Sequence, residues 1–266
     1  MNHKSENPSH VQSVTRALTL LDILAKKNRE MSLTEVAEAS GWAKSTVHGL
    51  LSTLRDYHMA DQSPDSGNYH LGIRLFEYGN QIARSWSIRS VSLPAMELLN
   101  QELGEMVQLA TGDNGDVLYI EKLESTHLLR IVSEIGARLP MHCSSLGKVL
   151  LAYKMPSEVK WILSKKGMAR WTTHTITDMH TLEKELETIR AQGYSTDDGE
   201  IMEGLRCIAA PIFDKDGRVR YAMSVSGIAG SFRGERTDHI VKSLLRAADT
   251  ISRAMGYFSS GESPTD

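Results

Sequence analysis

The sequence predicts an α+β protein in two parts, a small helical N-terminal domain closed by a β-hairpin and a larger domain built around an antiparallel sheet. Three observations support this prediction. Residues 11–57 hold two segments, 11–27 and 43–57, whose apolar positions recur every three to four residues, as in amphipathic helices. The turn-rich segment 63–68 separates two short strand-like runs. Beyond residue 105, short strands alternate with helices, an order typical of an α+β domain.

The first three helices follow from periodicity and end signals. The first is predicted over 11–27. Ser32 and Glu35 have the spacing of a capping box, and Gly41 supplies a stop eight residues later. The third helix, 43–57, has a buried face made of Val47, Leu50, Leu51 and Leu54. Two compact helices joined by a glycine turn, the second with a polar outer face, indicate a helix-turn-helix.

The hairpin at 59–71 is the wing of that motif, so we predict a winged helix-turn-helix domain over 11–71. A linker helix is expected over 72–88 and a second domain over 89–258, with disordered tails at 1–10 and 259–266. In the second domain we expect further helices at 91–103, 144–152, 158–165, 179–192 and 237–255. We expect its strands at 107–111, 117–123, 128–133, 194–197, 208–213 and 219–226.

Composition excludes several classes of protein. The net charge is -3, so charge alone does not point to nucleic acid. Cys143 and Cys207 form no CxxC pair and do not suggest a disulfide scaffold. The polar start at 1–10 lacks the apolar core of a signal peptide, and no run of 18 apolar residues could span a membrane. We therefore expect a cytoplasmic protein with no membrane partner.

Several segments, in the same order, resemble the IclR family of bacterial transcriptional regulators. In the N-terminal part these are Ser13–Leu18, Leu33–Ala37 and Lys44–His48. In the C-terminal part they are Leu139–Lys148, Gly193–Asp198, Gly204–Phe213 and Ala222–Gly227. Two positions depart from the family pattern: Ala43 stands where Pro is frequent, and Gly49 stands where Arg is frequent. Because Gly49 has no side chain to contact DNA, the operator sequence does not follow from the family pattern.

The resemblance implies a GAF-like C-terminal domain with a pocket for a small organic effector. It also implies a homodimer formed through the N-terminal region, a homotetramer built from it, and binding to pseudo-palindromic operator DNA. A repressor is implied more strongly than an activator. The class of effector stays open among carboxylates, sugar acids and aromatic metabolites.

The candidate DNA-binding residues lie where a winged helix-turn-helix meets the duplex. The early turns of a recognition helix enter the major groove, and its positive end favours phosphate. Arg16 and Thr34, near the starts of the first two helices, are placed to contact the DNA backbone. The candidates on the recognition helix are Lys44, Ser45, Thr46 and His48. The alternative is that these are ordinary solvated residues of a small helical domain.

The candidate effector-binding residues come from separate segments. Ser144, Ser145 and Leu146 open a helix whose free N–H groups suit a carboxylate. By the resemblance, four more residues face the same pocket: Asp197, Cys207, Ser224 and Ser226. Alternation along a strand puts Ser224 and Ser226 on one face. The alternative for these polar residues is an internal hydrogen-bond network.

Two other functions compete with an effector-controlled DNA-binding regulator. One is a ligand-binding signalling module whose N-terminal domain contacts protein; the other is a small-molecule hydrolase. Cys143 beside His142 suggests a nucleophile and base, but neighbours on a strand point to opposite faces. No HExxH spacing is present, although His142, His174 and His180 are free to converge. We therefore expect no enzyme activity, no cofactor and no metal.

Overall fold

A computed structural model describes residues 11–85, 87–126 and 134–258 of the chain. The chain divides into two compact units, residues 1–86 and 87–266, each described separately below. The tails predicted at 1–10 and 259–266, and the strand predicted at 128–133, lie outside the described residues. Within the described part, no helix is both long and apolar enough to cross a bilayer.

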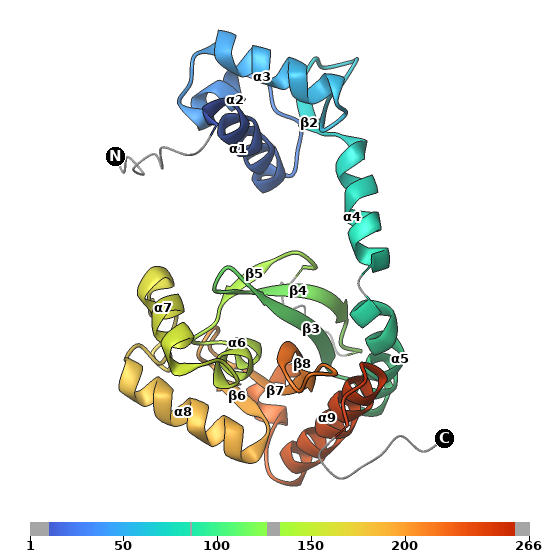
Figure 1. The fold of residues 1–266 in the computed structure, drawn as a ribbon, viewed down its shortest axis with the longest axis vertical. Helices are drawn as coiled ribbons and strands as arrows, with labels where there is room; N and C mark the ends of the chain where they lie inside the picture. Colours follow the sequence, from blue (N-terminus) through green and yellow to red (C-terminus); the bar gives the residue numbers. More distant parts are fainter. Residues whose placement is uncertain (1–10, 86, 127–133, 259–266) are drawn as a thin grey trace. The chain divides into compact units, whose positions relative to one another are not determined.

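The N-terminal unit is a winged helix-turn-helix, as predicted (Figure 1). Its elements are α1 (Gln12–Lys27), α2 (Leu33–Ser40), α3 (Lys44–Asp56), β1 (Ala60–Gln62), β2 (Tyr69–Leu71) and α4 (Ile73–Ser85). The three helices and the hairpin bury one core, which includes Leu20, Leu24, Met31, Val36, Val47, Leu51, Ala60 and Tyr69. That shared core fixes the angle at which α3 presents its outer face.

The capping box at the start of α2 forms as predicted. The Ser32 hydroxyl accepts a hydrogen bond from the Glu35 N–H over 3.3 Å, and the Glu35 carboxylate accepts one from the Ser32 N–H over 2.8 Å. The bonds that the Glu35 carboxylate accepts from the Ser32 N–H, from Arg29 and from the Ser32 hydroxyl lower the pKa of Glu35 to about 2. Gly41 ends the helix at φ 72°, a left-handed conformation that glycine adopts without strain.

Several hydrogen bonds tie the wing to the rest of the N-terminal unit, among them the backbone bridge between Tyr69 and Met31. Arg55, near the end of α3, donates to Gln62 Oε1 over 2.6 Å, and Gln62 Nε2 donates to the Gly67 carbonyl over 2.7 Å. Ser66 at the tip donates to the Glu30 carboxylate over 2.7 Å. These bonds hold the hairpin next to α3. The hairpin itself, residues 59–71, contains no Lys or Arg.

The C-terminal unit holds a six-stranded sheet among its described residues, with order β5-β4-β3-β8-β7-β6 and every neighbouring pair antiparallel. The strands are β3 (Met106–Asp113), β4 (Asp116–Leu123), β5 (Arg138–Pro140), β6 (Ser195–Asp198), β7 (Leu205–Phe213) and β8 (Val219–Ile228). The helices are α5 (Ser87–Leu103), α6 (Ser145–Ala152), α7 (Pro156–Lys166), α8 (Met179–Gln192) and α9 (Glu235–Ala254), with a short 3₁₀ turn η1 (Ala229–Ser231). This arrangement confirms the predicted α+β class with an antiparallel sheet.

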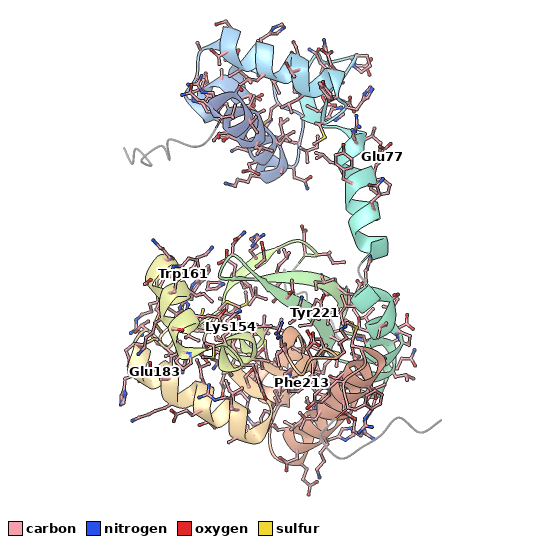
Figure 2. The ribbon with its side chains drawn as sticks, viewed as in Figure 1. Glu77, Lys154, Trp161, Glu183, Phe213 and Tyr221 are labelled. Atoms are coloured by element: carbon pink, nitrogen blue, oxygen red, sulfur yellow. The ribbon has the colours of Figure 1, made fainter. Side chains whose placement is uncertain are left out.

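Helices cover both faces of this sheet. Along β8, Ala222 and Ser224 point to one side and Met223 and Val225 to the other, and all four are buried. α6 packs on the strands from one side, while α5 contacts β3 and β4 and α9 contacts β7 and β8. α7 and α8 lie outside α6, with Trp161 and Glu183 on the outer surface (Figure 2).

Three local details differ from the sequence prediction. The periodicity predicts a linker helix as far as Ile88, but α5 already begins at Ser87, and Ile88 is buried. The three-residue strand β5 was not predicted, because so short a run carries no periodicity. His142 and Cys143 lie in the turn that leads into α6, not on a strand.

Candidate effector cavity and DNA-binding surface

A cavity of about 170 Å³ lies between the start of α6 and the sheet. The structure brings all seven candidate effector-binding residues to its wall: Ser144, Ser145, Leu146, Asp197, Cys207, Ser224 and Ser226. It adds eight residues that the sequence did not single out: Gln108, Tyr119, Ala137, Arg138, Leu139, Ile201, Met202 and Leu205. Gln108 and Tyr119 lie within the largely apolar strands β3 and β4, where sequence alone cannot show which side chains share a wall.

Strand register explains why residues so far apart in sequence meet here. Asp197 on β6 lies directly opposite Cys207 on β7, and Cys207 lies opposite Ser226 on β8. One row further along, Ser224 faces Gln108 on β3. Because side chains in one row point to the same face of a sheet, these groups form one polar patch.

The start of α6 forms the opposite wall. Ser144 caps the helix by accepting from the Gly147 N–H over 3.2 Å, and its hydroxyl donates to the Pro140 carbonyl over 2.8 Å. The N–H groups of Ser145 and Leu146 belong to the first turn, which has no acceptor within the helix. They are therefore placed to donate to an anionic group in the cavity.

Asp197 places a buried carboxyl group, which can accept hydrogen bonds, on the cavity wall. The residue is 1% exposed, and Oδ1 accepts the Glu200 N–H over 2.7 Å. Oδ2 has no hydrogen-bond partner among the residues that the structure describes. Burial raises the pKa of this carboxyl to about 7, while the Glu200 N–H and the charge of Lys148 act in the opposite direction. A buried oxygen without a partner is costly, so a donor supplied by a ligand would be stabilised here.

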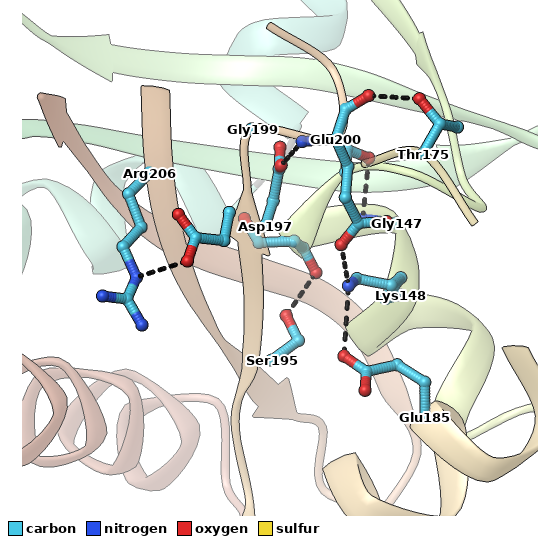
Figure 3. Close-up of polar contacts among 12 residues, drawn as sticks. Gly147, Lys148, Thr175, Glu185, Ser195, Asp197, Gly199, Glu200 and Arg206 are labelled. Carbon is cyan, nitrogen blue, oxygen red and sulfur yellow. Dashed lines mark hydrogen bonds and ion pairs between the residues drawn. The ribbon is translucent and has the colours of Figure 1, made fainter. Parts of the chain in front are cut away.

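Lys148 is buried behind the cavity in an ion cluster (Figure 3). Its Nζ lies 3.1 Å from Glu185 Oε1 and contacts the Glu200 carboxylate, and its side chain is 1% exposed. Burial alone would lower the pKa of this ammonium group, but the two carboxylates outweigh burial and raise it. Lys148 therefore stays charged and anchors Glu200.

The segment that carries Glu200 is held at further points. Thr175 donates to the Glu200 carbonyl over 2.6 Å, and Thr172 donates to the Gly199 carbonyl over 2.6 Å. Ile201 and Met202, which follow directly, line the cavity. The ion cluster and these two threonines thus fix one wall of the cavity.

The two serines on β8 already have partners inside the protein. Ser224 and Ser226 both donate to Gln108 Oε1, over 3.3 Å and 3.0 Å. Gln108 also hydrogen-bonds the Tyr119 hydroxyl, although burial still raises the pKa of Tyr119. The internal network considered as an alternative to a ligand site therefore exists, and it lies on the cavity wall.

The cysteines do not resemble nucleophiles. Burial raises the pKa of Cys143 to about 12, and burial also raises that of Cys207, so both are thiols near neutral pH. The His142 ring lies 3.0 Å from the Ala169 carbonyl oxygen. Among the described residues, no group of three or more His, Cys, Asp or Glu side chains is arranged to hold a metal.

The candidate DNA-binding residues gather around the start of α3. Lys44, Ser45 and His48 are exposed, and Thr46 is half-buried. Thr34 is exposed at the start of α2. Arg16 on α1 lies over the Trp42 ring, with its guanidinium carbon 5.5 Å from the ring centroid, just before α3 begins.

A winged helix-turn-helix in the same chain as a domain with a small cavity that carries a few polar groups defines the class of ligand-responsive transcriptional regulators. The chain belongs to the IclR family of bacterial transcriptional regulators. Residues 80–253 match the domain described as bacterial transcriptional regulator IclR C-terminal, and residues 13–64 match the IclR helix-turn-helix domain. The resemblance drawn from the sequence motifs is thereby confirmed.

Named relatives agree with this assignment. The HTH-type transcriptional regulator KdgR of Escherichia coli is 37% identical over 253 residues, covering 95% of each chain. The transcriptional repressor IclR of Escherichia coli is 34% identical over 248 residues, covering 92% of this chain and 90% of the relative. Because these relatives are named as regulators and repressors, the prediction of a regulator that is not an enzyme is confirmed.

A solved structure of similar fold contains a small molecule. It is an IclR homolog from Microbacterium hydrocarbonoxydans complexed with 4-hydroxybenzoate, with a TM-score of 0.82 and 26% identity. The match covers 92% of this chain and 99% of that one.

Proposed function

We propose that this protein binds operator DNA through α3 and that a small organic effector in the cavity of about 170 Å³ controls this binding. The observation that carries the proposal is the convergence of seven candidate residues on one wall that includes a buried, unpartnered Asp197 oxygen. The relative named as a repressor favours repression over activation. A transcriptional regulator acts where the chromosome lies, so we place it in the cytoplasm.

The effector is an organic anion held at the start of α6. The N–H groups of Ser145 and Leu146 supply the donors, and the patch of Asp197, Ser224 and Ser226 lies across from them. The homolog bound to 4-hydroxybenzoate supports a carboxylate as one part of the effector. The cavity volume lies below the roughly 300–1,000 Å³ of sites for drug-sized molecules, which favours a small metabolite.

The DNA-binding form is a homodimer that recognises a pseudo-palindromic operator, and dimers pair further into a homotetramer. Supporting this, the N-terminal unit exposes apolar side chains on two of its helices: Val14 and Leu18 on α1, and Ile73 and Phe76 on α4. Such side chains are stabilised when a second copy covers them. Effector binding in the cavity is coupled to the N-terminal unit through the segment 72–88. Binding therefore changes the spacing of the two recognition helices of the dimer.

The test is selection of genomic DNA fragments by the purified protein, repeated with a Lys44→Ala/Thr46→Ala variant. We expect enrichment of one pseudo-palindromic sequence that the variant fails to enrich. Lys160→Ala is the matched control, because Lys160 is an exposed lysine on α7 in the other unit. The control should select the same fragments as the unaltered chain.

Absence of enrichment over bulk DNA at low salt, with the protein dimeric, would contradict the proposal. In that case the signalling module, whose N-terminal domain contacts protein, becomes the better explanation. Binding that persists unchanged in the Lys44→Ala/Thr46→Ala variant would instead move the DNA-binding surface away from α3.

A further inference from the structure

Trp161 lies on the outer side of α7, the helix that covers α6 (Figure 2). Its exposed fraction is 61%, whereas Val159, Ile162 and Leu163 of the same helix are buried. A tryptophan ring contributes a large apolar area and is among the side chains enriched at protein interfaces. Single exposed apolar residues are common on protein surfaces, so a role for Trp161 depends on what surrounds it.

A groove of about 480 Å³ lies directly beside this ring, between α7 and the turn that joins β3 to β4. Its wall includes the buried side chains of Met141 and Ile162. Gly112 and Gly115 also border the groove and add no side chains that would fill it. The volume falls within the roughly 300–1,000 Å³ of sites that hold drug-sized molecules, and an indole ring is smaller than such a molecule. The groove can therefore receive a tryptophan ring.

Contacts between the β3–β4 turn and α7 hold this groove in shape. Lys166 Nζ on α7 lies 2.6 Å from Asp116 Oδ2 in the turn. The turn also packs closely on the helix, because a Cβ added at Gly115 would lie 3.1 Å from Ile162 Cγ2. A partner therefore meets a groove that is formed before binding, and little conformational freedom is lost when the partner docks.

The projecting ring and the groove lie side by side on one surface, and this arrangement favours a second copy of the chain as the partner. In a two-fold interface the same patch serves on both copies, so each contact from one copy is repeated by the other. One copy then supplies Trp161 to its partner's groove and receives the partner's Trp161 in its own. A different protein would need to carry a matching ring and a matching groove independently.

The charges along α7 also fit a second copy. The first turn of the helix carries Glu158, the last turn carries Lys165, and Trp161 lies close to midway between them. A two-fold axis that crosses α7 at a right angle near Trp161 makes the two helices antiparallel. Glu158 of one copy then lies opposite Lys165 of the other, on both sides of the axis. Opposite charges placed in this way fix the register of an interface.

We propose that α7 forms a two-fold interface with α7 of a second copy, in which each Trp161 ring occupies the partner's groove, and that this interface joins two dimers into the homotetramer. The inference deepens the proposed function and rests on the homodimer proposed there. Because α7 belongs to the C-terminal unit, its interface is separate from the exposed apolar side chains of α1 and α4. The assembly carries two DNA-binding dimers and can hold two operator sites at once.

The test is sedimentation velocity on the full chain over a series of concentrations. The unaltered chain should form tetramers, and Trp161→Ala should form dimers. Loss of a central interface ring weakens binding by about thirtyfold or more, and the two-fold axis counts it twice, so the dissociation constant of the tetramer should rise about a thousandfold. Trp171→Ala is the matched control, because Trp171 is 55% exposed and does not line the groove. The control should remain a tetramer.

A charge exchange tests the antiparallel arrangement. Lys165→Glu places two carboxylates opposite each other and should weaken the tetramer severalfold, as should Glu158→Lys. The Lys165→Glu/Glu158→Lys variant restores opposite charges and should recover most of the lost affinity. Because Glu158 also accepts the Met155 N–H over 3.1 Å at the start of α7, thermal melts establish that these variants are folded.

A folded Trp161→Ala variant that remains a tetramer would overturn the interface, as would an unaltered chain that never exceeds a dimer. A charge-exchanged variant no tighter than Lys165→Glu alone would overturn the antiparallel pairing. Monomers in place of dimers in Trp161→Ala would support the α7 interface and contradict the N-terminal homodimer of the proposed function. That function fails separately if the unaltered chain selects no operator, whatever its state of assembly.

Discussion

The guanidinium group of Arg16 lies over the ring of Trp42, with the carbon at its centre 5.5 Å from the ring centroid. This contact joins α1 to the turn that precedes α3. It holds the cation beside the helix proposed to enter the major groove, so we expect Arg16 to lose less conformational freedom on contacting DNA than a free side chain would.

The first prediction concerns this pair. Arg16→Ala should weaken operator binding about tenfold, in line with loss of one charged hydrogen bond. Trp42→Leu keeps apolar packing but removes the ring, and should weaken binding less. In a double-mutant cycle measured by fluorescence anisotropy, Arg16→Ala/Trp42→Leu should bind no worse than Arg16→Ala alone. Effects that simply add would mean that Trp42 does not position Arg16.

The sequence was sufficient for features governed by local chemistry. The capping box of Ser32 and Glu35, the Gly41 stop and the buried stripe through Val47 and Leu51 each depend on residues within one helix, and each formed as predicted. The wing also follows from its turn formers at 63–68. The seven cavity residues were named from the family motifs, and their common wall appeared only in the fold.

Features that depend on strand register could not be predicted. Gln108 lies in the apolar run of β3, which is buried on both sides, so alternation does not reveal which wall it joins. Its partner Ser224 lies more than a hundred residues away. Lys148 likewise resembles an ordinary helix lysine in sequence, because the carboxylates that neutralise it come from α8 and from the segment after β6.

The second prediction concerns the buried ion cluster. Lys148→Met leaves the Glu200 carboxylate buried without its cation, and should lower the free energy of unfolding by about 3–5 kcal/mol. Urea unfolding followed by circular dichroism measures this. Lys160→Met is the control, because that lysine is 65% exposed and its ion pair with Glu183 should contribute at most about 1 kcal/mol. Equal losses in both variants would contradict a structural role for the cluster.

The third prediction is a pH dependence at Asp197. Its pKa is about 7 in the folded chain and near 3.8 without burial, so the folded state holds the extra proton between these values. The stability from this group is complete below the lower value and is lost as the pH rises through 7. The advantage of Asp197→Asn over the unaltered chain should therefore grow as the pH rises from 5 to about 7, on the order of 1.4 kcal/mol for each pH unit, and level off above 7.

Melting temperatures at a series of pH values measure this gain. Asp198→Asn serves as the control, because Asp198 is the next residue and is exposed. If the difference in melting temperature between Asp197→Asn and the unaltered chain does not change with pH, then Asp197 is ionised throughout the range and the prediction is wrong.

The fourth prediction compares two glycines within helices. A Cβ added at Gly49 in α3 meets no atom within 4 Å, so Gly49→Ala should raise the free energy of unfolding by about 0.5–1 kcal/mol. A Cβ at Gly147 in α6 would lie 2.4 Å from the Met141 backbone, so Gly147→Ala should cost about 1–3 kcal/mol or more. Urea unfolding of both variants measures the two effects. A loss of stability in Gly49→Ala would contradict the open surroundings of this position in the fold.

The most direct test of the central claim is the Kd for the selected operator, measured by fluorescence anisotropy with and without an acid that calorimetry shows to be bound. We predict that the acid changes this Kd by about 5- to 150-fold, the usual range of allosteric coupling. An Asp197→Ala/Ser226→Ala variant should keep the ligand-free Kd and lose the response. An operator Kd that stays the same with the cavity occupied would contradict the claim that this cavity controls DNA binding.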